Sequence, residues 1–288
     1  MSLEKELVTA CAEGNLNSVK NILSYKNINI HFLNELPFQT ACQYGHLSIV
    51  KELLKLSGKR KINIHADKEE AFISACFRGH IHIVKYLLSY PIDINAKDSE
   101  AFRLACEQGH LSIIKLLLKK AKDLNVHALK ELGFKWACEK GHIRVVKFLL
   151  SLKGKNKIDI KVEHQDAVTA AIKNNQLTII NLLLQLKNDR KIDIHTSDDK
   201  YFKYALLKRQ DDVIKILLKY ATPTYFLHLA KKHHSILPFI HALKHNISIA
   251  QMPFNNEQEL TNFFKSDCLK SELVNALKQQ NKKNYKKS

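Results

Sequence analysis

The stretch Ala75–Leu88, ACFRGHIHIVKYLL, decides how this chain folds. It begins with an alanine-cysteine pair, a glycine-histidine pair follows two residues later, and its second half repeats apolar residues at helical spacing. Glycine alone takes the left-handed backbone conformation freely, so Gly79 is expected to end one helix before the next begins. The stretch therefore predicts two short helices joined by a tight turn.

The same pattern recurs along the chain in a fixed order. It begins at seven positions, Ala10, Ala41, Ala75, Ala105, Ala137, Ala171 and Ala205, and the last two copies are weaker. Successive alanines are 31, 34, 30, 32, 34 and 34 residues apart. Each helix pair is followed by a connector of the INIH or IDIN type. A regular period of this length indicates that the units stack on one another as a repeat protein.

This unit resembles the ankyrin repeat in its period, its alanine pair, its Gly-His turn and its Ile-Val-x-x-Leu-Leu segment. The resemblance covers about residues 7–220 and implies an all-α ankyrin-repeat solenoid of about seven helix-turn-helix units. The Thr-Pro-Leu-His sequence that starts the family's repeat is mostly replaced, and only the second unit keeps the proline, as Pro37. The connectors are also about three residues shorter, so we expect reduced or distorted fingers. Some units carry extra residues after the second helix: Ser57–Lys61, Lys153–Lys157 and Lys187–Lys191.

The period predicts three parts along the chain. Residues 1–220 are expected to form the repeat array. Residues 221–280 are expected to form a helical C-terminal cap or extension, because a terminal repeat otherwise exposes an apolar face. The basic residues 281–288 are expected to be a mobile tail.

The cysteine and histidine of each unit raise the question of a metal or catalytic site. Cys11, Cys42, Cys76, Cys106 and Cys138 share one position, which Ile172 and Leu206 occupy in the next two units. Since isoleucine and leucine cannot ligate zinc, we predict a buried apolar position instead. Stacked units lie roughly 8–10 Å apart, beyond the Cα separation of about 7 Å that a disulfide allows. The thiols should therefore be free, and the resemblance implies that His46, His80, His110 and His142 stabilise the turn.

The chain carries no glycine-rich phosphate loop, no Gly-x-Ser-x-Gly and no His-Glu-x-x-His. The adjacent His233 and His234 are interpreted as solvated or capping residues, and Cys268 as a packed residue of an amphipathic helix. We therefore predict no enzyme activity, no catalytic residue, no metal site and no cofactor.

The resemblance implies that a protein partner meets the exposed positions just before each turn glycine. Trp136 is added because aromatic residues and arginine dominate interface hot spots; the strong alternative is that it packs between neighbouring helices. The predicted partner-binding residues are Gln43, Tyr44, Phe77, Arg78, Glu107, Gln108, Trp136, Glu139, Lys140, Lys173, Asn174 and Lys208.

An alternative function follows from the formal net charge of +18. Lys51, Lys85, Lys115 and Lys147 share one register and, with the extra segments, would form a basic ridge for anionic lipid or nucleic acid. The competing interpretation is that such lysines favour helix C-termini and keep the surface soluble. The segment residues of this ridge are Lys59, Arg60, Lys61, Lys153, Lys155, Lys157, Arg190 and Lys191.

The leading interpretation is a monomeric, non-enzymatic scaffold that binds a protein of unknown identity. No stretch reaches the roughly 18 apolar residues that would span a bilayer, and the free thiols favour a reducing cytoplasm. The Lys-, Asn- and Ile-rich units with a C-terminal extension also resemble effector proteins that intracellular bacteria deliver into a host cytosol. Ankyrin proteins of other lineages, including large viruses, share these features.

Overall fold

The computed structural model describes residues 2–160, 167–194, 200–208 and 210–220. The chain divides into two compact units, residues 1–170 and 171–288, and each is described by itself. The expected cap at 221–280, the tail at 281–288, His233, His234 and Cys268 lie outside the described residues.

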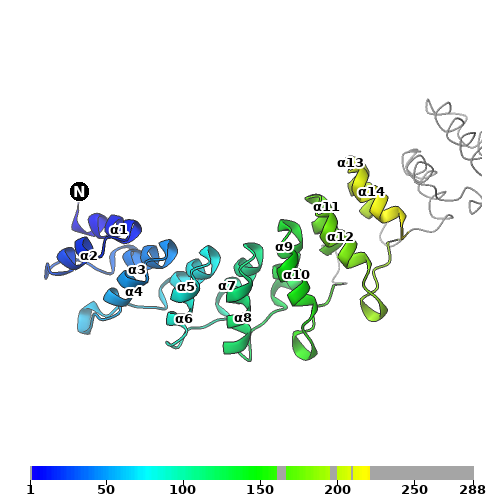
Figure 1. Ribbon diagram of the computed structural model, residues 1–288. Helices are drawn as coiled ribbons and strands as arrows, with labels where there is room; N and C mark the ends of the chain where they lie inside the picture. Colours follow the sequence, from blue (N-terminus) through cyan, green and yellow to red (C-terminus); the bar gives the residue numbers. More distant parts are fainter. Residues whose placement is uncertain (1, 161–166, 195–199, 209, 221–288) are drawn as a thin grey trace, which may run out of the picture. The chain divides into compact units, whose positions relative to one another are not determined.

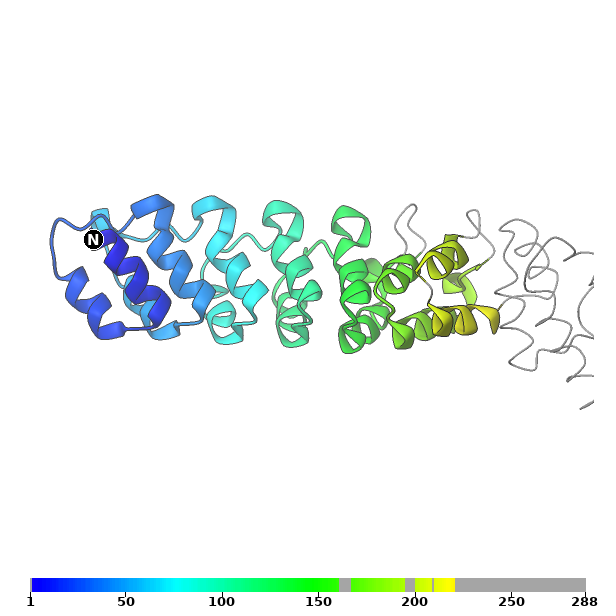
Figure 2. The same ribbon diagram turned by 90° about the horizontal axis from the view of Figure 1, so that it is seen from above.

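The first unit is a stack of helix pairs (Figures 1 and 2). Each first helix packs on the first helix of the next pair, and the second helices through α8 also pack on one another in chain order. The first helices are α1 (Leu3–Glu13), α3 (Phe32–Tyr44), α5 (Ala66–Arg78), α7 (Ala96–Glu107) and α9 (Ala128–Lys140). The second helices are α2 (Leu16–Leu23), α4 (Leu47–Leu53), α6 (Ile81–Leu87), α8 (Leu111–Lys120) and α10 (Ile143–Leu150). Two of the extra segments form 3₁₀ turns, η1 (Gly58–Arg60) and η2 (Gly154–Asn156).

The division between the two units falls within α11 (Ala167–Lys173). The second unit continues with α12 (Leu177–Leu184), the 3₁₀ turn η3 (Asn188–Arg190), α13 (Lys200–Leu207) and α14 (Asp211–Leu218). Ile172 is buried, so an isoleucine fills the position that cysteine occupies in earlier repeats. The helical composition predicted from the repeat pattern is therefore confirmed, and the described residues contain no strand.

The turn glycines are held by the histidine of the following repeat. Gly14, Gly45, Gly79 and Gly109 have φ between 76° and 88°, a conformation that costs other residues free energy. A Cβ added to Gly14 would lie 2.5 Å from Cε1 of His46, and the other three glycines meet the next histidine at 2.5–2.6 Å. Glycine is thus required here both for its backbone conformation and for the space above its Cα.

The same histidine also forms a hydrogen bond between repeats. Nε2 of His46 lies 2.9 Å from the carbonyl oxygen of Ala12, and Nε2 of His80 lies 2.8 Å from the carbonyl oxygen of Gln43. His110 and His142 repeat this contact with Phe77 and Glu107, at 2.9 and 2.6 Å. The turn-stabilising role that the resemblance implies is therefore carried out on the turn of the preceding repeat.

The fingers are short left-handed turns. Four first helices begin with three consecutive residues of positive φ: Leu33–Glu35, Asp67–Glu69, Lys97–Ser99 and Leu129–Glu131. For residues other than glycine, this conformation costs roughly 1–2 kcal/mol per residue. The expected distortion of the fingers is thus a run of three left-handed residues, and each finger needs compensating interactions.

Buried carboxylates supply that compensation. Glu35, Glu69 and Glu131 are 2–3% exposed, and each accepts a 2.6 Å hydrogen bond from Nδ1 of the histidine four residues earlier. The same Oε1 atom accepts the backbone N–H of Asn63, Asp93 or Asp159 in the next connector, at 2.9, 3.2 and 3.0 Å. Each of these fingers is therefore tied to its successor.

Two of these histidines face an acceptor on both ring nitrogens. Nε2 of His31 lies 2.9 Å from the carbonyl oxygen of Lys59, and Nε2 of His127 lies 2.6 Å from that of Lys155. A carbonyl and a carboxylate only accept hydrogen bonds, so this geometry favours the imidazolium form of each ring, in which both nitrogens donate. The bonds to Lys59 and Glu35 raise the pKa of His31. Burial opposes the charged form of His127, but its bonds to Lys155 and Glu131 outweigh burial and raise its pKa.

Gly79→Ala should lower the free energy of unfolding by more than about 1 kcal/mol, because alanine resists positive φ and its Cβ meets His110. The cost should be smaller in a His110→Ala background, with a coupling energy of about 0.5–3 kcal/mol. Urea denaturation followed by circular dichroism measures all four proteins of this cycle. Additive effects would contradict a direct contact between the glycine turn and the histidine.

The raised pKa of His31 predicts how stability depends on pH. Its contribution should be complete below about pH 6.5, the ordinary histidine value, and should be lost as pH rises through the raised pKa. His31→Gln should therefore flatten the fall in Tm between pH 6 and 9. His82→Gln, at an exposed position of α6, is the control and should leave the slope unchanged. An unchanged slope for His31→Gln would show that this ring carries no folding-linked proton.

Candidate partner-binding face

Apart from Trp136, the predicted partner-binding positions in the first unit lie in the last turn of α3, α5, α7 or α9, or directly after it. Tyr44 is 56% exposed, and Arg78, Gln108 and Lys140 are also exposed, whereas the residue before each of them is half-buried. We call Gln43, Tyr44, Phe77, Arg78, Glu107, Gln108, Glu139 and Lys140 the first-helix face. The structure thus places these predicted residues at equivalent points on successive helices that pack together.

The inter-repeat histidines fix the backbone of this face. The carbonyl oxygens that accept from His80, His110 and His142 belong to Gln43, Phe77 and Glu107. Side chains near the face also contact one another: Lys140 Nζ lies 3.8 Å from Glu107 Oε1, and the Arg78 guanidinium lies 5.2 Å from the Phe77 ring centroid. Residues held in this way lose little conformational freedom on binding.

In the second unit, Lys173, Asn174 and Lys208 are exposed. The ammonium of Lys173 lies 5.7 Å from the ring centroid of Tyr204, so this lysine already has an aromatic neighbour within the fold. All three residues are therefore accessible to a partner, as the prediction requires.

Trp136 is a predicted partner-binding residue that contacts a neighbouring repeat. It is half-buried, and its ring lies 5.6 Å from the guanidinium carbon of Arg103. Arg103 is only 7% exposed and donates to the carbonyl oxygens of Asp98 and Lys97, both at 2.9 Å. Trp136 is therefore in contact with the preceding repeat, as the packing interpretation expects, and its role in partner binding stays a prediction.

Arg103 is a residue that sequence reasoning missed. It lies two positions before the repeat alanine, where the second repeat has Gln39. Gln39 likewise donates to a carbonyl oxygen of its left-handed turn, that of Asn34, at 2.9 Å. The available signal was that this position, next to the apolar stripe of the first helix, is polar in four of five successive units: Gln39, Arg103, Lys135 and Thr169.

The cysteines belong to the core. Cys11, Cys42, Cys76, Cys106 and Cys138 are all fully buried free thiols, as predicted. Burial raises the pKa of Cys11 to about 12 and raises the pKa values of the other four as well. Within the described residues no three His, Cys, Asp or Glu side chains are arranged to hold a metal ion. The geometry therefore assigns these thiols a packing role.

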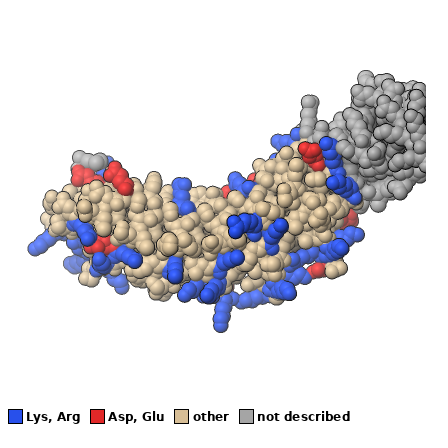
Figure 3. Space-filling view, viewed as in Figure 1, with Lys and Arg blue, Asp and Glu red and all other residues tan. Residues whose placement is uncertain are grey.

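Several cations of the predicted basic ridge already contact the neighbouring repeat. Lys51 lies 5.4 Å from the Tyr86 ring centroid and Lys115 lies 5.3 Å from that of Phe148. Arg60 donates to the carbonyl oxygen of Leu23 at 2.9 Å, and Lys155 donates to that of Lys122. Figure 3 shows lysine and arginine side chains along the lower edge of the first unit, where the second helices lie. Part of the ridge thus stabilises the stack.

The remaining cations of the extra segments differ in how exposed they are. Lys59, Lys61, Lys153 and Lys157 are exposed in the first unit, as is Lys191 in the second, whereas Arg190 is half-buried.

These helix pairs, glycine turns and inter-repeat bonds define an α-helical repeat solenoid. The sequence model described as "Ankyrin repeats (3 copies)" matches residues 7–98, 38–128 and 134–226. The chain belongs to the ankyrin-repeat family, whose repeats generally mediate protein–protein interactions. The search of curated proteins found no match to the sequence. In the part of the chain that the structure describes, no helix has the length and apolar character needed to cross a membrane.

The burial of the thiols predicts their reactivity. In a Cys268→Ser variant, Ellman's reagent should leave the five core thiols unmodified in the native protein at pH 8 and should modify all five in guanidinium, because the reactive species is the thiolate. Stopped-flow absorbance at 412 nm measures both rates. Rapid labelling of the native variant would place at least one of these cysteines outside the core.

Proposed function

We propose that this chain is a non-enzymatic scaffold that binds a protein partner through the first-helix face. The observation that carries the proposal is that this face combines exposed aromatic and charged side chains with a backbone that hydrogen bonds from the next repeat hold in place. Tyr44 and Arg78 are the strongest candidates, because aromatic residues and arginine contribute most to interface hot spots. The exposed cations Arg78 and Lys140 favour a partner surface that carries carboxylates.

A finer version of this proposal makes the chain an effector that a bacterium delivers into a host cytosol. The Lys-, Asn- and Ile-rich repeats and the sequence that follows them support it. A cytosol would also keep the buried thiols reduced. In this version the partner is a host protein.

The exposed lysines of the lower edge support a second candidate, binding of anionic lipid or nucleic acid. Such binding would weaken steeply with salt, because it depends on phosphate contacts. Affinity purification from eukaryotic cytosol at two salt concentrations separates the candidates. A single protein retained at high salt supports the scaffold, whereas release of all bound material by salt supports the basic ridge.

The first-helix face is tested by a Tyr44→Ala/Arg78→Ala double variant against the partner so identified. We expect at least a tenfold loss of affinity with an unchanged circular dichroism spectrum, because both side chains are exposed. Tyr25→Ala/Arg144→Ala is the matched control, since these residues are also exposed but lie at and beyond the ends of second helices rather than on the face. Isothermal titration calorimetry measures both. Equal affinities for the two double variants would remove the face from the interface.

A further inference from the structure

The third repeat lacks the 3₁₀ segment that the second, fifth and sixth repeats possess. Fifteen positions separate Val50 from His65 in the second repeat, whereas eleven separate the equivalent Val84 from Asn95 in the third. The missing four residues correspond to the part that forms η1 in the second repeat. The shortened connector instead runs through Tyr90 and Pro91.

Where the segment is present, it covers the connector of the preceding repeat. The carbonyl oxygen of Lys59 lies 2.9 Å from Nε2 of His31, and Arg60 donates to the carbonyl oxygen of Leu23 at the same distance. In the fifth repeat, Lys155 of η2 offers its carbonyl oxygen to His127 in the same way. The segment thus satisfies one histidine of the preceding repeat in both cases.

At the next junction the covering segment is absent and a hollow of about 470 Å³ remains. Leu54 and His65, the counterparts of Leu23 and His31, both line it. Nδ1 of His65 bonds to Glu69, but Nε2 has no hydrogen-bond partner among the described residues. The side chain of His65 is 48% exposed, so this nitrogen is accessible to a binding partner.

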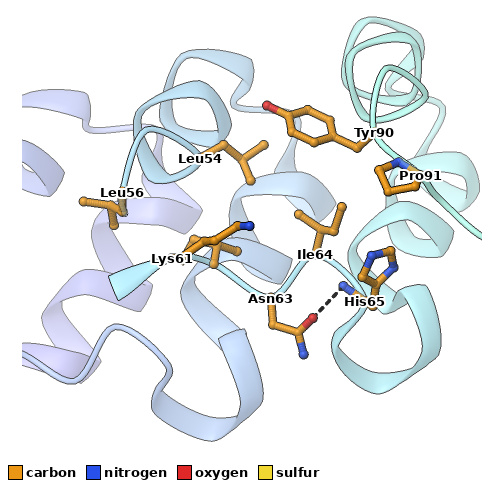
Figure 4. Close-up of a pocket in the computed structure, with 9 residues that line it drawn as sticks. Leu54, Leu56, Lys61, Asn63, Ile64, His65, Tyr90 and Pro91 are labelled. Carbon is orange, nitrogen blue, oxygen red and sulfur yellow. Dashed lines mark hydrogen bonds between the residues drawn. The ribbon is translucent and has the colours of Figure 1, made fainter. Parts of the chain in front are cut away.

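The remaining lining residues define the chemistry of an occupant. Figure 4 shows the apolar side chains of Leu54, Ile64, Tyr90 and Pro91 around the hollow, with Lys61 and His65 contributed by one connector. No carboxylate lines the hollow, and its basic residues are Lys61 and His65. An occupant that matches this surface is apolar with an adjacent negative charge.

We propose that this hollow binds an extended segment of a partner protein in which an aliphatic or aromatic residue neighbours an acidic one. The main chain of that segment replaces the missing 3₁₀ turn, and its carbonyl oxygen accepts from Nε2 of His65 as the Lys59 carbonyl does from His31. The apolar side chain packs among Leu54, Ile64 and Tyr90. The carboxylate accepts a charge-assisted hydrogen bond from the Lys61 ammonium.

This proposal goes beyond the scaffold function and does not depend on it. The hollow is formed by connectors and the ends of second helices, whereas the first-helix face lies in the last turns of first helices. The Tyr44→Ala/Arg78→Ala variant should therefore bind the occupant normally.

The decisive variant fills the hollow with the protein's own sequence. Ser89–Pro91 is replaced by the sequence of Lys55–Lys61, which restores the four missing residues. A phage library of random dodecapeptides is panned against the full-length chain with the filled variant as counter-selection. We expect enriched peptides in which an apolar residue neighbours Asp or Glu. The most enriched peptide, made synthetically, should bind the filled variant at least tenfold more weakly in fluorescence polarisation.

Point variants test the same site without altering chain length. His65→Gln should lower the affinity for the synthetic peptide at least fivefold, and Lys61→Glu should lower it at least tenfold. His127→Gln is the matched control, because its histidine lies at a junction that η2 already covers, and binding should stay within twofold. The absence of enrichment over the filled variant, selection of basic peptides, or equal loss in His65→Gln and His127→Gln would each overturn the proposal.

Discussion

The stack depends on a steric constraint between one glycine and the histidine of the next repeat. The imidazole of His46 occupies the space where a side chain on Gly14 would begin, and its Nε2 bonds to the carbonyl of Ala12 two residues before that glycine. A single ring therefore fits only against a glycine turn in the preceding repeat. The same ring also bonds to one of the helix-terminal carbonyls that have no partner in an isolated helix. Because the contact recurs at Gly45, Gly79 and Gly109, every junction from the first repeat to the fifth inherits the same geometry.

The fingers show a different balance between cost and compensation. Three left-handed residues cost each finger roughly 3–6 kcal/mol at 1–2 kcal/mol per residue. The turn places a glutamate where its Oε1 accepts both a histidine N–H and a backbone N–H of the next connector. The other carboxylate oxygen of Glu35, Glu69 and Glu131 stays buried without a hydrogen-bond partner, so the carboxylate needs a nearby positive charge. The imidazolium form of His31 and His127 supplies that charge and links finger stability to pH.

The repeat pattern was sufficient to predict the fold, because period, glycine position and apolar spacing all reflect local backbone preferences and burial. The buried cysteines were predictable for the same reason: isoleucine replaces cysteine in a later repeat, and only packing tolerates both. The left-handed fingers were not predictable in this form, because residues such as Leu33 and Lys97 have no intrinsic preference for positive φ. Their conformation is stabilised by contacts that form only in the folded stack, with the next repeat and with polar residues of the same helix. Gln39 and Arg103 escaped notice because a donor for turn carbonyls matters only once that turn exists.

The irregular spacing of the repeats has a physical meaning that the average period hides. Loop length changes cost little free energy, so repeats gain or lose residues after the second helix without unfolding the stack. Each change nevertheless alters what covers the preceding connector. The second and fifth repeats bring a carbonyl to His31 and His127, while the third repeat brings none to His65. The fourth repeat satisfies the third connector differently, since Asn95 donates from Nδ2 to the carbonyl of Asp123 and accepts the N–H of Asn125. Because the connector at His65 lacks the carbonyl that His31 and His127 receive, the binding proposed for this hollow would be a direct consequence of variation in repeat length.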